Sequence, residues 1–257
     1  MLDVSFTFGT YNRLSHLRQT IESCRVQADG MSYEIVVVGV TDDIETLDYL
    51  RAQSDVVLIE HGELLGANRA HHDAAEAAQG EFCVLCNDDV AWEQTGIIRA
   101  CVLYLRENQN VGAVAFGQDI PNQAANYMAM MECRTPSDRR FIGPVLEMGI
   151  VRKVDGDDAG WLGATSGPMA GARSYWGDVF LTGRLWEAGR RIDHLPIARI
   201  LHYKVEDALR QQNNDTWQKD SECFRQVFPN NYVNVPEWLF DQQQVNSEQW
   251  TAHRSYP

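Results

Sequence analysis

Three short polar clusters in the chain carry residue types that could bind a phosphorylated ligand or a metal ion. They are Thr10-Tyr11-Asn12-Arg13, residues 39–43, and Asn87-Asp88-Asp89. Carboxylate and amide oxygens are hard ligands, so the third cluster suits Mg²⁺ or Mn²⁺, with substrate phosphates completing the coordination shell. Asn and Asp also favour solvated turns, because their side chains hydrogen-bond the nearby backbone. Residue type alone leaves both interpretations open.

A strand is predicted immediately before each cluster, and strands alternate with helices along the first half of the chain. Strands are expected at residues 4–8, 34–38, 55–59, 81–86 and 111–116, and helices at 14–24, 43–51, 67–79 and 92–108, with Gly80 as the C-cap of the third helix. This alternation predicts an α/β fold with a mainly parallel sheet flanked by helices. Ligands of open α/β sheets bind at the carboxyl ends of the strands, so the fold would bring the three clusters to one edge.

The regular alternation ends after Gly117. A helix at 180–189 and a strand at 191–197 follow a less regular stretch, and the chain is polar from residue 207 onward. We therefore predict one domain over residues 1–257, composed of a regular half at 1–116, a less regular half at 117–206 and a C-terminal helical and polar extension at 207–257. The basic pairs Arg139-Arg140 and Arg152-Lys153 could contact a phosphate or form solvated loops.

Composition limits the classes of partner. The net charge of −14 argues against a nucleic acid or an anionic membrane as the main partner, because either requires a basic surface. The apolar runs are too short to span a bilayer, and the first residues lack the basic segment of a signal peptide. We therefore expect a cytoplasmic protein without stable membrane insertion.

Three other functional patterns are disfavoured. The turn after the first predicted strand contains Gly9 alone, which is too little for a dinucleotide-binding loop, and the chain has no Walker A sequence. Cys83 and Cys86 form a CxxC pair within a predicted strand, where side chains three residues apart point to opposite faces. We expect them to be buried thiols rather than a redox or zinc pair.

Several segments resemble, in order and spacing, the family 2 glycosyltransferases. The resemblance is carried by residues 4–13, 34–38, Gly66 with His71-His72, residues 77–81, Asn87-Asp88-Asp89 as an Asn-first form of the DXD motif, residues 176–192, and His202. It extends over residues 4–203. The chain departs from the family pattern at Gly39, where an aspartate usually pairs with the base, at His71 and His72, and at Gly177 and Phe180 beside Asp178.

The resemblance implies a GT-A fold and an inverting transfer of a sugar from a nucleotide-sugar donor, with a UDP-sugar expected. Residues 1–116 would bind the donor, and residues 117–206 would bind the acceptor and hold the catalytic base. Donor contacts are implied for Thr10, Tyr11, Arg13, Asp42 (or Asp43), His71, Asn87 and Asp88, and acceptor contacts for Trp161 and Trp176.

The same resemblance implies Asp89 and His202 as ligands of Mn²⁺ or Mg²⁺, although a histidine beside a strand can also be purely structural. It implies Asp178 as the base that takes the proton of the acceptor hydroxyl. An aspartate before a helix can instead serve as its N-cap.

Two alternative functions stay open at the level of the sequence. A sugar-phosphate nucleotidyltransferase uses similar sheet and metal chemistry, and a non-catalytic nucleotide- or sugar-binding relative would fit the departures from the family pattern. The acceptor could be a saccharide, a lipid-linked saccharide or a modified nucleobase. Nucleic acid is therefore expected only as an acceptor substrate.

Overall fold

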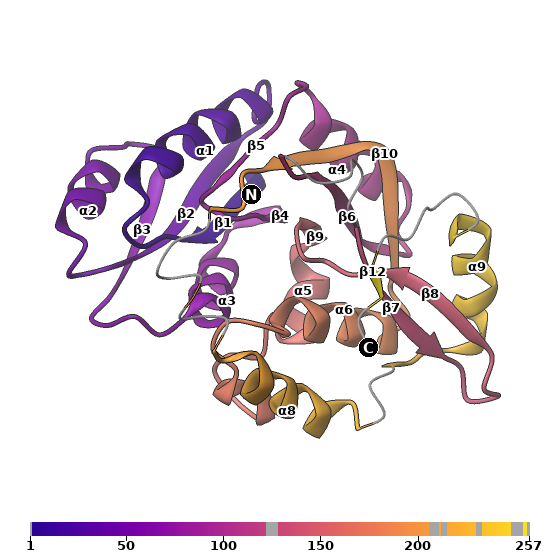
Figure 1. Cartoon of the computed structure of the whole chain (residues 1–257). Helices are drawn as coiled ribbons and strands as arrows, with labels where there is room; N and C mark the ends of the chain where they lie inside the picture. Colours follow the sequence, from indigo (N-terminus) through magenta and orange to yellow (C-terminus); the bar gives the residue numbers. More distant parts are fainter. Residues whose placement is uncertain are drawn as a thin grey trace.

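The computed structural model of the chain describes residues 2–121, 128–205, 211, 215–229, 233–247 and 254–255. An eight-stranded sheet with the order β3-β2-β1-β4-β9-β6-β10-β5 forms its centre (Figure 1). Its strands are β1 (Leu2–Gly9), β2 (Tyr33–Val40), β3 (Val56–His61), β4 (Gly80–Leu85), β5 (Val90–Ala91), β6 (Val111–Asp119), β9 (Gly149–Arg152) and β10 (Arg191–His202).

The sheet is mainly parallel, as predicted. Strands β3, β2, β1 and β4 run parallel to one another, and β6 runs parallel to β10. Strand β9 is antiparallel to both β4 and β6, and β5 is antiparallel to β10. Because the parallel strands point the same way, their carboxyl ends share one edge of the sheet.

Helices cover both faces of this sheet (Figure 1). One face carries α1 (Leu14–Gln27), α2 (Ile44–Arg51) and α4 (Ile97–Glu107), and the other carries α3 (Ala67–Ala77), α5 (Lys153–Ala159) and α6 (Gly177–Glu187). None of the described helices has the length and apolar composition that crossing a bilayer requires.

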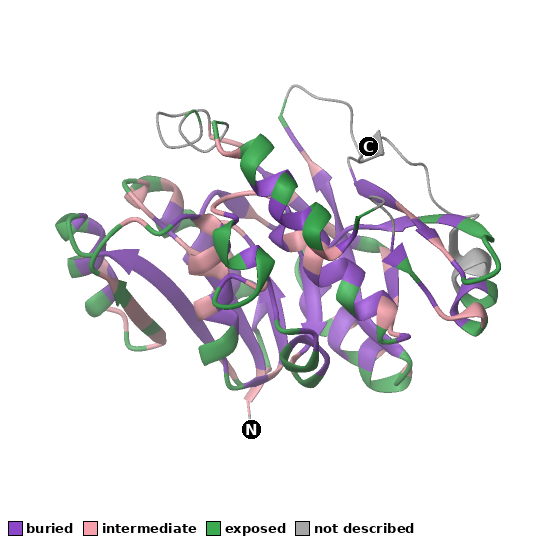
Figure 2. Ribbon diagram, turned by 90° about the horizontal axis from the view of Figure 1, so that it is seen from below, coloured by how far each residue is buried: buried purple, intermediate pink, exposed green. Residues whose placement is uncertain are grey.

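The apolar run of β2 is continuous because both of its faces are buried (Figure 2). Ile35 and Val37 belong to the core under α1 and α4, whereas Val36 and Val38 belong to the core under α3 and α6. The two cysteines of the CxxC pair divide in the same way, Cys83 in one core and Cys86 in the other, and all six cysteines are buried and free. The prediction of buried thiols is confirmed.

The stretch after Gly117 is more regular than the sequence predicted. Strands β7 (Ala129–Arg134), β8 (Arg140–Pro144), β11 (Val233–Asn234) and β12 (Arg254–Ser255) form a second, four-stranded sheet. A short 3₁₀ helix, η1 (Pro168–Gly171), and the helices α8 (Trp217–Val227) and α9 (Glu237–Ser247) complete this half. Its strands pair across up to 125 positions, Arg254 with Ala129 for instance, so local periodicity carries little trace of them.

Two predicted helix boundaries differ from the structure by several residues or in the role of the residue at the boundary. Gly80 is not a helix cap but the first residue of β4, since α3 ends at Ala77 and Ala78 is already extended. Helix α4 begins at Ile97 rather than near residue 92, because Gly96 precedes it in the left-handed region. Trp92 instead packs edge-on against Phe6 and Phe116.

Gly80→Ala should destabilise the protein by about 3 kcal/mol, because an added Cβ would lie 2.6 Å from the backbone nitrogen of Ser5 and 2.7 Å from the carbonyl carbon of Val4. Gly62→Ala is the matched control, since a Cβ there has nothing within 4 Å, and it should change stability by less than about 0.5 kcal/mol. Urea unfolding measures both variants. Equal losses would contradict the close approach of β4 to β1.

Candidate active site

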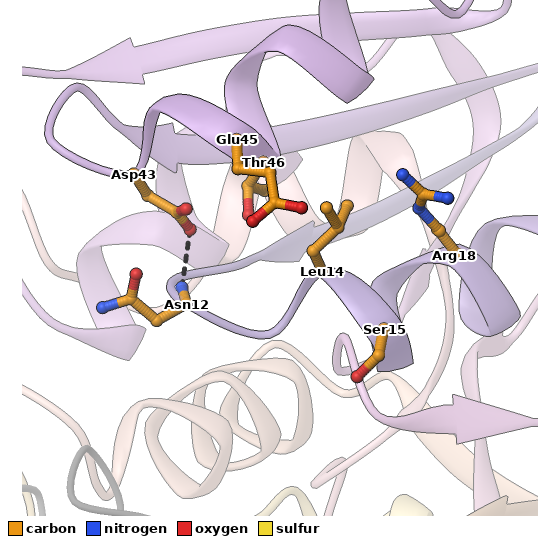
Figure 3. A pocket seen from close by; sticks show the side chains of 7 residues that line it. All are labelled: Asn12, Leu14, Ser15, Arg18, Asp43, Glu45 and Thr46. Atoms are coloured by element: carbon orange, nitrogen blue, oxygen red, sulfur yellow. Dashed lines mark hydrogen bonds between the residues drawn. The ribbon is translucent and has the colours of Figure 1, made fainter.

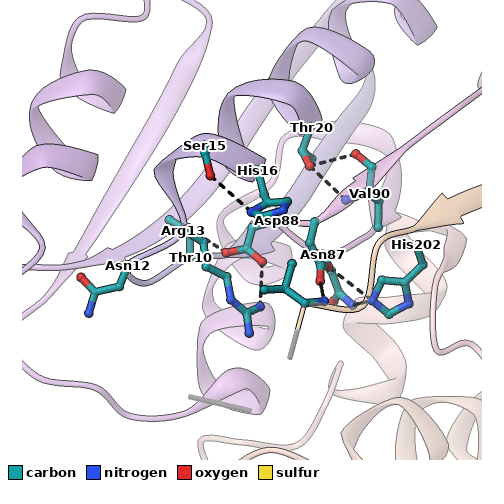
Figure 4. Close-up of polar contacts among 12 residues, drawn as sticks. Thr10, Asn12, Arg13, Ser15, His16, Thr20, Asn87, Asp88, Val90 and His202 are labelled. Carbon is teal, nitrogen blue, oxygen red and sulfur yellow. Dashed lines mark hydrogen bonds and ion pairs between the residues drawn. The ribbon is translucent and has the colours of Figure 1, made fainter. Parts of the chain in front are cut away.

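The first and third polar clusters meet at the carboxyl ends of β1 and β4 (Figure 4). Thr10 donates its hydroxyl to Asp88 Oδ2 at 2.8 Å, and Arg13 Nη1 lies 3.2 Å from Asp88 Oδ1. Asp88 is 4% exposed, and burial raises its pKa to about 6, against the opposing effect of Arg13. The carboxyl end of the sheet therefore holds a buried acid whose partners both come from the β1–α1 turn.

The second cluster lies beside the same turn. Tyr11 donates its hydroxyl to Asp42 Oδ2 at 3.1 Å, and the backbone N–H of Asn12 donates to Asp43 Oδ2 at 2.6 Å (Figure 3). A cleft of about 520 Å³ opens here between the first turns of α1 and α2. It is lined by Asn12, Leu14, Ser15, Arg18, Asp43, Glu45 and Thr46.

Asp89 and His202 face each other across the ends of β4 and β10. Their nearest atoms, Asp89 Oδ1 and His202 Nε2, are 3.3 Å apart. The second carboxylate oxygen of Asp89 accepts the backbone N–H of Val205 at 3.0 Å, and its carbonyl accepts the N–H of Tyr203 at 2.9 Å. Oδ1 is buried and makes no hydrogen bond with the described residues.

Gln118, at the end of β6, sets the orientation of the His202 ring. Its amide nitrogen donates to Glu147 Oε2 at 2.7 Å, which leaves its carbonyl oxygen facing His202 Nδ1 at 2.9 Å. A carboxylate only accepts, so this assignment of the amide places a proton on His202 Nδ1, and the neutral form of the ring then carries its lone pair on Nε2. Two electron-pair donors, Nε2 and Asp89 Oδ1, therefore face each other.

A divalent cation fits this pair. Adjacent ligands of an octahedral ion with bonds of about 2.1 Å lie about 3 Å apart, close to the observed separation of 3.3 Å. A cation would also satisfy the buried Asp89 Oδ1, which is otherwise without a partner among the described residues. Asn87 lies beside this pair, with its amide nitrogen 3.5 Å from His202 Nε2.

Asp178 lies in the first turn of α6, not at its N-cap. Trp176 occupies the cap position with φ of 69°, so the alternative that Asp178 caps the helix is wrong. Burial and the negative charge of Glu147 raise the pKa of Asp178 to about 7. Thr182 on α6 connects Asp178 to the segment that contains Glu147. Its hydroxyl accepts the N–H of Leu146 at 2.9 Å and donates to the Asp178 backbone carbonyl at 2.7 Å.

Gly177 has a structural reason for replacing the acidic residue that the family pattern favours. A Cβ at this position would lie 2.5 Å from Asn68 Oδ1. Asn68, at the start of α3, is buried and donates from Nδ2 to the carbonyl of Tyr175 at 2.8 Å. The loop before α6 therefore lies directly against α3.

The structure corrects the expected acceptor role of Trp161. This side chain is 2% exposed, its ring covers Gly156, and its indole N–H donates to Asp157 Oδ1 at 2.8 Å. It is a core residue with almost no surface left for a ligand. Trp176 is 5% exposed and packs against Phe224, with ring centroids 4.9 Å apart, so little of its surface is accessible.

Three arginines of the two basic pairs have partners within the protein. Arg139 lies near Glu237 and Asp241, and Arg140 lies near Asp138. Arg152 is buried and donates to the carbonyl of Leu105 at 2.6 Å.

Of the two histidines on α3, His72 is buried, with Nε2 3.2 Å from the hydroxyl of Thr165. Burial lowers the pKa of His71 to about 4, so this ring is neutral at pH 7. Its contact with a donor stays a prediction.

Two residues of the site, Gln118 and Glu147, were not found from the sequence. Gln118 had one usable signal, its position just beyond the predicted strand at 111–116, because polar residues after strands face the ligand edge. Glu147 precedes β9, which was not predicted, and its approach to Gln118 depends on that strand entering the sheet between β4 and β6.

Comparison with known proteins places the chain in a family. The family model described as glycosyl transferase family 2 matches residues 6–151, more than half of the chain. The chain belongs to this family. The family match favours a glycosyltransferase over the nucleotidyltransferase alternative, and no curated protein matches the chain in sequence. Asp178 and His202 lie beyond the matched residues.

Solved structures show the same fold. A mannosyltransferase, PcManGT from Pyrobaculum calidifontis in complex with GDP-Man and Mn²⁺, is similar over 96% of this chain and 69% of its own, with a TM-score of 0.65 and 17% identity. Residues 1–349 of TarS from S. aureus are similar over 78% of this chain and 60% of their own, with a TM-score of 0.59 and 16% identity. The fold of this glycosyltransferase is of the GT-A type.

Asp178→Asn should remove a fall in stability that the wild type shows between about pH 4 and pH 7. In that interval the folded state keeps a proton on Asp178 that the unfolded state has lost, so the free energy of unfolding decreases as the pH rises. Relative to its value at pH 4, the wild-type free energy of unfolding should be lower by on the order of 2 kcal/mol above pH 7 because of Asp178, and Asp178→Asn should lack this decrease. Unfolding by urea across this pH range measures it.

Asp158→Asn is the control, since Asp158 is an exposed aspartate of the same half of the chain. It should preserve the wild-type pH dependence. Parallel curves for the wild type and Asp178→Asn would show that Asp178 titrates normally.

Proposed function

We propose that this glycosyltransferase is metal-dependent and inverting, and that it moves a sugar from a nucleoside-diphosphate sugar to an acceptor hydroxyl. The observation that carries the proposal is the buried pair of Asp89 Oδ1 and His202 Nε2, 3.3 Å apart. The carboxylate of Asp178, with its raised pKa, lies on the acceptor-side half of the same domain. We keep residues 1–116 as the donor half, 117–206 as the acceptor half and 207–257 as a segment that completes the domain.

The donor is proposed to lie along the carboxyl edge of β1, β2 and β4. Thr10 and Arg13 already hold Asp88, and the same turn is where the ribose and diphosphate of a donor would lie. The base is proposed to contact Tyr11 and Asp42, near the cleft between α1 and α2 (Figure 3). A UDP-sugar is the expected donor, and the GDP-Man bound by the similar mannosyltransferase makes a GDP-sugar the second to test.

Asp89 and His202 would hold Mn²⁺ or Mg²⁺. When bound, such an ion stabilises the charge that develops on the diphosphate leaving group. Gln118 keeps the lone pair of His202 Nε2 directed toward that position through its hydrogen bond to Nδ1. Arg13 supplies a fixed positive charge at the same edge.

Asp178 is proposed to act as the general base. As the acceptor oxygen attacks the anomeric carbon, the bond from that carbon to the diphosphate breaks and the hydroxyl proton passes to the Asp178 carboxylate. Attack opposite the leaving group inverts the anomeric configuration. A pKa near 7 makes this carboxylate a stronger base than an ordinary aspartate while it is still largely ionised above neutral pH.

The acceptor surface is proposed to include Tyr175 and Trp217 in place of Trp161. Their rings meet edge to face with centroids 5.0 Å apart, and Trp217 is 40% exposed. Both adjoin Trp176, whose centroid is 5.2 Å from that of Trp217 and which precedes Asp178 by two residues. Aromatic side chains can pack on the apolar faces of sugar rings, so we propose a saccharide or lipid-linked saccharide as the acceptor.

Asp178→Asn should lower the rate of donor turnover by about 10²–10⁴-fold and leave the affinity for the nucleoside diphosphate unchanged, because the base acts only in the chemical step. Release of UDP or GDP from a panel of sugar donors with Mn²⁺ measures turnover, with water or added oligosaccharides as acceptors. Calorimetry with UDP and GDP measures affinity.

The wild-type rate should rise with pH toward a plateau above pH 7, as the Asp178 carboxylate loses its proton. Glu147→Gln removes the neighbouring negative charge, lowers the pKa of Asp178 and should move this rise to lower pH. A fully active Asp178→Asn enzyme would rule out Asp178 as the base.

Asp89→Ala should weaken the Mn²⁺-dependent binding of UDP or GDP by more than about tenfold, because it removes one of the two proposed protein ligands. Titration calorimetry with and without Mn²⁺ measures the difference. Asp29→Ala, which changes an exposed aspartate, is the control and should bind as the wild type does. Equal affinities of Asp89→Ala and the wild type in Mn²⁺ would refute the ligand assignment.

A further inference from the structure

Asp220, on α8, is a fully buried carboxylate that the catalytic roles above do not use. Its Oδ1 accepts the backbone N–H of Arg173 at 2.8 Å. Its Oδ2 accepts the N–H groups of Ser174 at 2.8 Å and Tyr175 at 2.9 Å, and also the hydroxyl of Thr216 at 2.8 Å. Three consecutive backbone amides thus converge on one side chain.

This arrangement fixes the path of the loop. Residues 173–175 belong to no helix or strand, so their N–H groups have no regular partners in secondary structure. A buried carboxylate needs hydrogen bonds from its surroundings, and a buried N–H needs an acceptor, so the two requirements satisfy each other. Hydrogen bonds to an ionised oxygen are also stronger than those between neutral groups.

The opposite side of the loop is held by α3. Asn68 donates its backbone N–H to the carbonyl of Arg173 at 3.0 Å and its side-chain amide to the carbonyl of Tyr175 at 2.8 Å. Asp220 thus accepts the N–H groups of all three loop residues, and Asn68 donates to the carbonyls of two of them, Arg173 and Tyr175. The loop is clamped between a helix of the donor half and a helix of the C-terminal segment.

The clamp ends one residue before the unusual cap of α6. Trp176 has φ of 69°, which is uncommon for a bulky residue and persists only where the surroundings enforce it. The direction in which α6 leaves this cap determines where Asp178 lies. Asp220 therefore affects the position of the proposed base indirectly, through the loop 173–175 and the cap residue Trp176.

We propose that Asp220 is a positioning residue of the transfer reaction, which holds the loop 173–175 so that α6 presents Asp178 to the acceptor hydroxyl. This inference rests on the proposed role of Asp178 as the base. It gives the C-terminal segment a function in catalysis, since α8 supplies the carboxylate from a position more than forty residues after α6 begins.

Asp220→Asn tests the proposal, because the amide keeps the shape of the side chain and turns one acceptor into a donor that opposes the loop N–H groups. We expect the amides of residues 173–175 to exchange at least tenfold faster with deuterium than in the wild type. We expect the rate constant for donor turnover to fall by about 100-fold, as misplacement of a reacting group by about 1 Å does. The affinity for UDP or GDP with Mn²⁺ should stay unchanged.

Thr216→Val is the matched control. It removes one hydrogen bond to the same carboxylate but none of the three from the loop, so exchange at 173–175 and turnover should both stay within about twofold of the wild type. Asp220→Glu serves if Asp220→Asn does not fold, because it keeps the charge and displaces the loop by one methylene. It should show the same selective loss of turnover.

The outcomes separate this inference from the proposed function. Faster exchange at 173–175 with normal turnover would overturn the positioning role, as would unchanged exchange in a folded Asp220→Asn protein. A parallel loss of donor affinity and turnover would assign Asp220 a purely structural role and also overturn the inference. An active Asp178→Asn enzyme would instead remove the base assignment, which the exchange measurement does not depend on.

Discussion

Two adjacent carboxylates, Asp88 and Asp89, are buried at the end of β4, and the organisation of the site follows from how each is satisfied. A buried carboxylate costs several kcal/mol unless charges or hydrogen bonds compensate it. Asp88 obtains its partners from the turn after β1, and the Asp89 carboxylate accepts the backbone N–H of Val205 from the segment after β10. Strands β1, β4 and β10 therefore have to end at the same level. Because β9 enters between β4 and β6, it also brings Glu147 to Gln118 and so orients His202.

The same constraint supports the proposed cation. Asp88 and Asp89 are adjacent, buried acids at a place where the proposed nucleoside diphosphate would add further negative charge. Arg13 contacts Asp88 and is already engaged by it. A divalent ion between Asp89 and His202 would let an acidic site accept an anionic donor.

The acceptor side is built from parts of the chain that are far apart. Asn68 of α3, the loop 173–175 and Asp220 of α8 form one clamp, and the second sheet combines β7 and β8 with strands from beyond residue 232. The C-terminal segment is therefore an integral part of the domain rather than an appended extension. The raised pKa of Asp178 shows a cost of this arrangement, because burial holds the carboxylate, our proposed base, where its charge is poorly solvated.

Strands β1 to β4 and β6, the helices between them, and the polar clusters around Thr10, Asp42 and Asp88 could be predicted from the amino-acid sequence. These features have local causes, since strand and helix periodicity and turn-forming residues act within a few positions. The contacts of Gln118, Glu147 and Asp220 and the burial of Trp161 became visible only in the folded structure. Each of these depends on hydrogen bonds or packing between residues up to about a hundred positions apart, and such contacts leave no periodic trace in the chain. A polar residue becomes a ligand, a base or a clamp only when the fold decides what surrounds it.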